Sequence, residues 1–194
     1  AQTGRFGPGI VTVDMLTSEA LLTNPFLSYA FPSGVPIAVS MSSVSPTLYR
    51  GVFELTEATT NGSAIAVFSA RDTLGNQGNQ VLSGAALNVD TLGPKVTVIT
   101  IAPEAPIENS ATVTVPVNVE FQLSEPAQVG VDPLFSYTLS TTQPSATALP
   151  GFTPVAGDRA RWSGSFDLPA NAGQGAPETL SFLSSAQDDL GNIE

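Results

Sequence analysis

The chain has 194 residues, with 6 Lys plus Arg against 17 Asp plus Glu, and it has no His and no Cys. A hydrophobic share of 42 % excludes a disordered acidic tail, which would combine high charge with few apolar residues. Without His or Cys the chain cannot form a Ser-His-Asp triad, a thiolate nucleophile, a zinc finger or a disulfide framework. We therefore expect a non-catalytic protein.

Charge and hydropathy argue against two classes of partner. The net charge is −11, and the five Arg and Lys95 are scattered singly, whereas nucleic-acid binding needs clustered basic residues. The longest apolar run, Ala64–Phe68, is far shorter than the roughly 20 residues that span a bilayer. We expect neither nucleic-acid binding nor membrane insertion. Residues 1–4 lack the basic and apolar regions of a signal peptide, so a targeting signal, if one exists, lies outside this chain.

Short apolar–polar alternations follow one another along the chain, which is typical of half-buried antiparallel strands. In chain order, the segments that we expect to be strands are 11–15, 25–29, 49–55, 64–70, 85–89, 95–101, 117–123, 133–137, 162–168 and 180–186. Segments 64–70 and 180–186 are apolar nearly throughout, which predicts central strands. Residues 17–22 could form a short helix, and Asn61-Gly62 has the composition of a hairpin turn. Many short strands with regular turn signals predict a β-sandwich or barrel.

Four of these segments occur twice, in the same order, which predicts two copies of one unit. The matching pairs are Val11–Glu19 with Val117–Glu125, Pro25–Tyr29 with Pro133–Tyr137, Tyr49–Leu55 with Trp162–Leu168, and Ser69–Asn76 with Ser185–Asn192. The offset between the copies increases from 106 to 116 residues along the chain, which is expected if the second copy has insertions in its loops. We predict an all-β chain with two domains, residues 1–93 and 94–194.

The end of the first copy resembles a repeat boundary in a known family. Ala70–Asn76 has the pattern A-x-D-x-x-G-N, and Val89–Pro94 has the pattern V-D-T-x-x-P. Both are similar to the closing turn and the linker of bacterial immunoglobulin-like (Big-type) repeats, and Ser124–Ala127 and Trp162–Phe166 resemble the same family. The resemblance implies two tandem immunoglobulin-like Greek-key β-sandwiches, of the kind found in secreted or cell-surface proteins of bacteria.

The aspartates of the closing turn and the linker are the candidate site residues. Asp72 and its copy Asp188 are best interpreted as structural, because an Asp in such a turn accepts hydrogen bonds from backbone N–H groups two or three residues on. The alternative is calcium, which prefers carboxylate and carbonyl oxygens. In that hypothesis Asp72 and Asp90 meet at the junction of the repeats, with backbone carbonyls or Glu125 completing the shell. No other cofactor is expected.

Paired carboxylates raise the question of glycoside hydrolysis, which needs two acids across a sugar. The candidate pairs are Glu54 with Glu57 and Asp188 with Asp189. We interpret them as solvated acids on an outward strand face and in a turn. Two aromatic residues, Tyr49 and Trp162, could stack on sugars, but both fall on the inward phase of their strands and are predicted to be core.

These patterns favour a structural or adhesive spacer segment of a larger bacterial surface or secreted protein. Its partners would be neighbouring repeats and possible surface glycans or proteins. The alternative is a carbohydrate- or protein-binding accessory module of a secreted enzyme, binding through loops such as 142–160, the largest insertion in the second copy. An extracellular or cell-surface location fits both.

The two copies differ at their ends. In the first copy the strand preceding Val11 is missing or rudimentary, and in the second copy the last strand is missing. An uncovered edge has unpaired N–H and C=O groups, so we predict that the chain either associates through these edges by strand addition or is less stable than a chain extended by roughly 15–20 residues.

Overall fold

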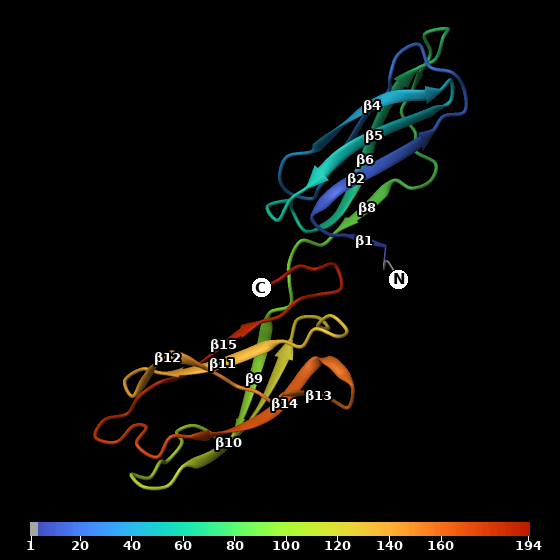
Figure 1. Cartoon of the computed structure of the whole chain (residues 1–194). Helices are drawn as coiled ribbons and strands as arrows, with labels where there is room; N and C mark the ends of the chain where they lie inside the picture. The colour runs from blue at the N-terminus through green and yellow to red at the C-terminus, as the bar shows by residue number, and fades with distance from the viewer. Residues whose placement is uncertain (1–3) are drawn as a thin grey trace. The chain divides into compact units, whose positions relative to one another are not determined.

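The structure is a computed structural model that describes residues 4–194, and every regular element in them is a β-strand (Figure 1). The chain divides into two compact units, Ala1–Leu92 and Gly93–Glu194. The boundary expected from the sequence, after residue 93, differs from this division by one residue. The described residues contain no helix that could cross a bilayer.

The first unit has eight strands in two arms that face each other across a core. They are β1 (Arg5–Phe6), β2 (Gly9–Leu16), β3 (Phe26–Ala30), β4 (Ile37–Ser45), β5 (Leu48–Leu55), β6 (Gly62–Arg71), β7 (Gln77–Gly78) and β8 (Ala86–Val89). One arm has the order β2-β5-β4 and the other the order β4-β3-β6-β8-β1, with β7 paired to the end of β6. Strand β4 belongs to both arms, because residues 37–39 pair with β3 and residues 40–45 pair with β5. The rings of Tyr29 on β3 and Phe53 on β5 meet with centroids 5.4 Å apart, which joins the arms through the core.

Alternation along the strands accounts for this core. On β5 the residues Tyr49, Gly51, Phe53 and Leu55 are buried, while Arg50, Val52 and Glu54 are exposed. The predicted inward face of this strand is confirmed, including the core position of Tyr49. Apolar residues of the facing arm, Leu27, Ala64, Leu87 and Val89, complete the same cluster. Burial on alternate positions is what fixes these segments as strands with one face in the core.

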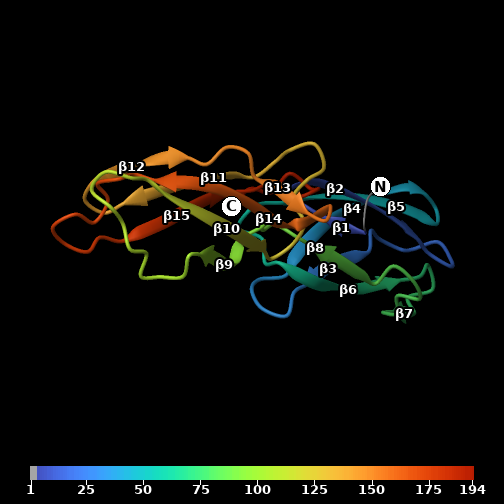
Figure 2. The same cartoon turned by 90° about the horizontal axis from the view of Figure 1, so that it is seen from below.

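The second unit has seven strands in two sheets. They are β9 (Val96–Ala102), β10 (Val115–Leu123), β11 (Leu134–Leu139), β12 (Gln143–Ala148), β13 (Thr153–Val155), β14 (Asp158–Leu168) and β15 (Leu180–Ser185). The sheets have the orders β13-β14-β10-β9 and β12-β11-β15 and can be followed in Figures 1 and 2. Phe121 of one sheet stacks on Phe135 of the other with centroids 4.2 Å apart, so the sheets share one core. Trp162 is fully buried there, which confirms its predicted core position.

The strand registers of the two units correspond residue for residue. Val11, Val13 and Met15 of β2 lie opposite Phe53, Gly51 and Tyr49 of β5. Val117, Val119 and Phe121 of β10 lie opposite Phe166, Gly164 and Trp162 of β14. The same holds in the other arm, where Leu27 lies opposite Phe68 and Phe135 lies opposite Ser184. The offsets found in the sequence give the same correspondence. Adding 106 to a residue number takes β2 to β10, 113 takes β5 to β14, 108 takes β3 to β11 and 116 takes β6 to β15.

A glycine occupies the same register position in both units because a core side chain fills the space above it. A Cβ on Gly51 would lie 2.5 Å from side-chain atoms of Val39 and Met41. A Cβ on Gly164 would lie 2.7 Å from the ring of Phe152. Both distances are far inside van der Waals contact, so each strand needs a residue without a side chain at this point.

Three local expectations are wrong. Residues 17–22 form no helix; this stretch is irregular, with a bridge from Leu21 to Asp72. Asn61-Gly62 is not a hairpin turn, because it joins β5 and β6, which lie in different arms, and the Asn61 side-chain oxygen accepts a hydrogen bond from the N–H of Thr91. Strand β15 is not central, because among the described residues it pairs only with β11. By contrast β6 pairs with both β3 and β8, as predicted for a central strand.

Candidate functional site

The two closing turns have one geometry. In the first unit, an oxygen of Asp72 accepts hydrogen bonds of 2.8 Å from the N–H groups of Leu74 and Asn76, and its other oxygen accepts one of 2.7 Å from the Asn76 side chain. In the second unit Asp188 accepts the same three bonds, at the same distances, from Leu190 and Asn192. The predicted structural interpretation is confirmed, with backbone donors two and four residues on.

These hydrogen bonds set the charge state of Asp72. The Asn76 side-chain amide, followed by the backbone N–H groups of Asn76, Leu74 and Gly75, lowers the pKa of Asp72 below its ordinary value. Hydrogen bonds to the charged form of a carboxyl group favour that form. The carboxylate therefore stays ionised to lower pH, and its two oxygens accept the hydrogen bonds that close the turn.

The structure does not bring Asp72 and Asp90 together. Asp90 directly follows Val89, which pairs with Gly62 at the start of β6, whereas Asp72 directly follows the end of β6. A ten-residue strand is about 30 Å long at roughly 3.3 Å per residue, so the two carboxylates cannot share an ion within this unit. The expectation that Asp72 and Asp90 meet is wrong, because the full length of β6 separates them.

Asp90 has its own local partners. Its carboxylate pairs with the guanidinium of Arg5, and its N–H donates a 2.9 Å hydrogen bond to the carbonyl of Phe6. These contacts hold β1 against the end of β8. Glu125 is half-buried and belongs to the second unit. Calcium binding stays a prediction, and an unchanged thermal midpoint after addition of EDTA would contradict it.

The two carboxylate pairs are placed differently from one another. Glu54 and Glu57 are exposed, as predicted for solvated acids. Asp188 is fully buried in its turn while its neighbour Asp189 is exposed, so the interpretation of this pair as two solvated acids is wrong for Asp188. The reason is the turn itself, whose N–H groups and Asn192 replace water around the carboxylate.

A carboxylate that the sequence did not single out has a strongly lowered pKa. Glu178 accepts hydrogen bonds from the N–H groups of Thr141 (3.0 Å) and Thr142 (2.9 Å), from the Thr142 hydroxyl (2.8 Å) and from the N–H of Gly173 (2.5 Å). The Thr142 N–H, then the Thr142 hydroxyl and the N–H groups of Gly173 and Thr141, lower the pKa of Glu178 to about 2. Glu178 thus fastens the turn after β11 to the loop before β15. Its donors lie up to 37 residues away in sequence, so no local pattern could reveal it.

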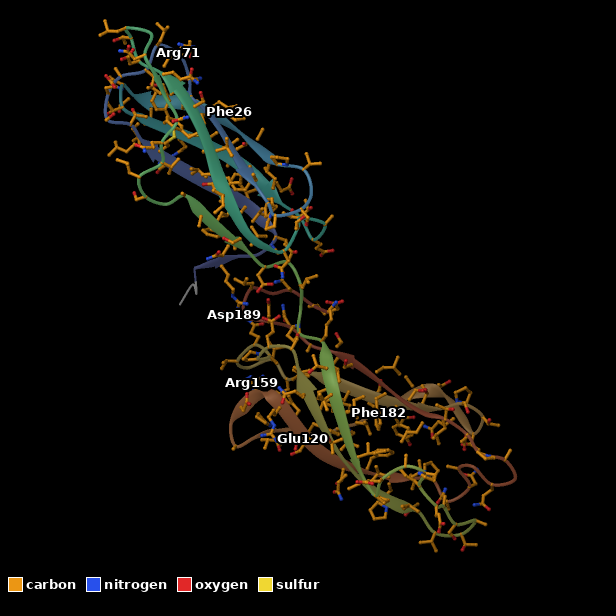
Figure 3. The ribbon with its side chains drawn as sticks, turned by 180° about the vertical axis from the view of Figure 1, so that it is seen from behind. Phe26, Arg71, Glu120, Arg159, Phe182 and Asp189 are labelled. Carbon is orange, nitrogen blue, oxygen red and sulfur yellow. The ribbon has the colours of Figure 1, made fainter. Side chains whose placement is uncertain are left out.

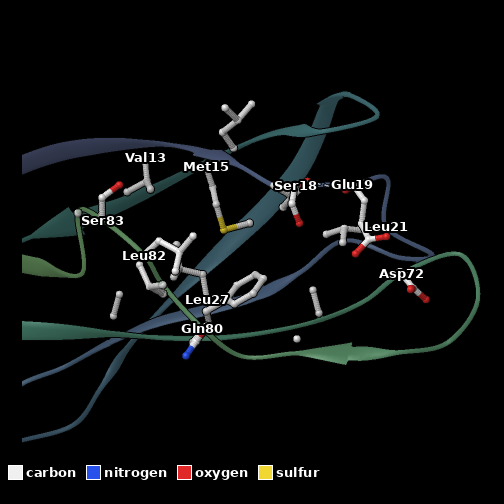
Figure 4. A pocket seen from close by; sticks show the side chains of 18 of the residues that line it. Val13, Met15, Ser18, Glu19, Leu21, Leu27, Asp72, Gln80, Leu82 and Ser83 are labelled. Atoms are coloured by element: carbon white, nitrogen blue, oxygen red, sulfur yellow. Dashed lines mark hydrogen bonds between the residues drawn. The ribbon is translucent and has the colours of Figure 1, made fainter.

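A sizeable cleft lies in each unit. The cleft in the second unit, about 800 Å³, lies between the segment 105–109 and the loop 172–180 beside Phe182. The cleft in the first unit, about 590 Å³, lies between β2 and the segment 80–84. Figure 4 shows the side chains of Met15, Leu27 and Leu82 around the latter. Neither candidate carboxylate pair lines a cleft.

The segment 142–160, expected to be a loop, is mostly strand. It contains β12, β13 and the start of β14, and β13 pairs with β14. Phe152 is buried in the core against Phe121 and Phe135, with ring centroids 5.3 and 5.2 Å away. The aromatic residue that could have served a binding loop is therefore part of the core.

No protein-family model matches the chain, and no curated protein is detectably similar to it.

Proposed function

We propose that this chain is a non-catalytic structural or adhesive spacer, part of a larger bacterial surface or secreted protein, and that its two units are tandem immunoglobulin-like Greek-key β-sandwiches. The observation that carries the proposal is the common register of the two units. Val13 opposite Gly51 corresponds to Val119 opposite Gly164. Each unit has its own hydrophobic core, so adding copies of such a unit lengthens a spacer segment without altering the other copies.

The state of the acidic side chains supports a structural role. Asp72 and Asp188 close turns, and Glu178 joins two loops. The pKa values of Asp14, Asp72 and Glu178 are all lowered from their ordinary values. A general acid in glycoside hydrolysis needs the opposite, a pKa raised toward neutrality. These carboxylates are therefore suited to holding loops in place.

The proposed extracellular location rests on the resemblance of Ala70–Asn76 and Val89–Pro94 to Big-type repeat boundaries. A chain without Cys is compatible with a bacterial surface protein that does not depend on disulfides. A net charge of −11 also favours solubility and weak nonspecific association, as an exposed spacer requires.

The test is a glycan array together with a whole-cell adhesion assay on the 194-residue chain. A spacer gives no saturable binding to any glycan class, and the same chain unfolded beforehand serves as the control for adherence through exposed apolar residues. Reproducible, saturable binding of the folded chain to one glycan class would overturn the proposal in favour of an accessory binding module.

A further inference from the structure

Strand β2 has one open edge. Its residues Gly9–Leu16 pair with β5 on one side, and among the described residues no strand pairs with the other side. The backbone N–H and C=O groups along such an edge can extend the sheet by one more strand. We call this side of β2 the β2 edge.

In the second unit the corresponding edge is covered. Strand β10, whose register on β14 matches that of β2 on β5, pairs on its other side with β9. The antiparallel β9 places Ile101 opposite Val119, Ile99 opposite Phe121 and Val96 opposite Leu123. Subtracting 106 from the β10 numbers gives the corresponding positions of the first unit. A strand that paired with β2 as β9 pairs with β10 would therefore place its three apolar side chains opposite Val13, Met15 and Thr17.

The cleft of about 590 Å³ lies directly inside the β2 edge. Its apolar lining comes from both arms and from the segment after β7, and it includes Val13, Met15, Leu27, Phe68 and Leu82. Val13 and Met15 pack against the core but are only partly buried, and Leu82 is 92 % exposed. An added strand would therefore meet both an unpaired backbone and an apolar cleft for its inward side chains.

Charge specifies one end of the added strand. The described residues that line the cleft include Asp14, Glu19 and Asp72 but no Lys or Arg. Asp14 is already paired with Arg50, and Asp72 with its turn, whereas Glu19 is exposed at the end of the cleft. In the second unit the residue before β9 is Lys95, whose carbonyl accepts a hydrogen bond from the N–H of Ser124. The same offset puts a basic residue opposite Ser18, next to Glu19.

We propose that the β2 edge and its cleft form an acceptor site for an extended strand of another polypeptide. The strand runs antiparallel to β2, begins with a basic residue beside Glu19, and continues with β-branched apolar residues that alternate with threonine or other small residues. Main-chain hydrogen bonds to β2 hold it, the cleft selects its inward side chains, and Glu19 selects its charged end. This inference does not depend on the spacer function.

The chain itself supplies a probe with this chemistry, a fluorescently labelled peptide with the sequence of residues 95–102, Lys-Val-Thr-Val-Ile-Thr-Ile-Ala. We expect saturable binding of this peptide to the full chain, measured by fluorescence anisotropy at low ionic strength. Hydrogen exchange should then show slower exchange of β2 amides. The backbone groups of Gln122 and Ser124 face β9, so by alternation Thr100, which lies opposite Glu120, directs its N–H at the neighbouring strand. A peptide with Thr100→Pro should therefore not bind, because proline there removes a donor from the ladder.

A charge-exchange experiment tests the orientation. Glu19 is exposed, so Glu19→Lys should leave the fold intact and weaken binding of the peptide about threefold to tenfold at low salt. A peptide with Lys95→Glu should bind the unaltered chain equally weakly and regain affinity for the Glu19→Lys chain. Without this recovery the proposed orientation is wrong.

Three results would overturn the proposal. The first is absence of saturable binding to a monomeric chain. The second is protection of the amides of another edge strand, such as β15, in place of β2 amides, which would put the peptide on a different edge. The third is a dimer of the chain, seen in sedimentation, whose β2 amides are protected and which the peptide does not dissociate. In that case the occupant of the β2 edge is a second copy.

Discussion

The side-chain amide of Asn76 donates a 2.7 Å hydrogen bond to the carboxylate of Asp72, four residues earlier in the same turn. Asn192 donates a bond of the same length to Asp188 in the second unit. Two backbone N–H groups of each turn also donate to the same aspartate, so three hydrogen bonds close each turn. The aspartate is thus the acceptor around which the last turn of each unit is built.

Asp188→Ala should destabilise the second unit strongly. The carboxylate is fully buried and accepts three hydrogen bonds, so its removal leaves buried donors without an acceptor. Hydrogen bonds to a charged group contribute about 1.5–3 kcal/mol each, and we expect a loss of about 2–4 kcal/mol after relaxation. Trp162 is the only tryptophan, so its fluorescence during urea unfolding reports on this unit. Asp167→Ala, at an exposed aspartate on β14 of the same unit, is the control and should change the unfolding free energy by less than about 0.5 kcal/mol.

Glu178 should make the stability of the second unit depend on pH. Its pKa is lowered from 4.5 to about 2 in the folded chain, so the folded state binds fewer protons than the unfolded state between these values. The stabilisation is fully present above about pH 4.5 and is lost as the pH falls toward 2. Glu178→Gln should remove this part of the pH dependence and lower the unfolding free energy at pH 7. Urea unfolding at pH 7, 4 and 3, followed by Trp162 fluorescence, measures both effects. An unaltered pH profile in the variant would contradict the role of Glu178.

Gly164→Ala should destabilise the second unit because the new methyl group meets the ring of Phe152, itself held in the core. Overpacking of this kind costs about 1–3 kcal/mol. Gly51→Ala should act in the same way in the first unit, against Val39 and Met41. Gly78→Ala is the control, because no atom lies within 4 Å of its added Cβ. Denaturation midpoints of the three variants should therefore separate into two lowered values and one unchanged value.

Arg159→Lys should loosen the segment 127–132. The guanidinium of Arg159, labelled in Figure 3, donates hydrogen bonds of 2.9, 2.6 and 2.9 Å to the carbonyls of Ala127, Gln128 and Val131. It also lies 4.9 Å from the ring centre of Trp162. A lysine cannot reproduce this planar set of donors, so we expect a loss of about 1–3 kcal/mol and a shifted Trp162 emission maximum. Equal stability and emission in the lysine variant would show that charge alone suffices.

Local patterns were enough to predict ten of the strands and the closing turns, whereas β4, β12 and β13, and the two-residue strands β1 and β7, were not predicted. Alternation along Tyr49–Leu55 determines which side chains face the core, because successive residues of a strand point to opposite faces. The turn at Asp72 depends on donors within four residues of the aspartate, so its geometry is also encoded locally.

The arrangement of these strands was decided only by the tertiary structure. Neighbours in sequence such as β5 and β6 lie in different arms, which is why Asn61-Gly62 is not a hairpin turn. Asp72 and Asp90 are separated by the whole length of β6. Glu178 accepts a hydrogen bond from the N–H of Thr142, which lies on a turn far from it in sequence. Whether an apolar strand is central, as β6 is, or at an edge, as β15 is, also depends on which other strand pairs with it. Long-range pairing is set by the sum of many contacts across the core, and no single segment of the sequence contains that information.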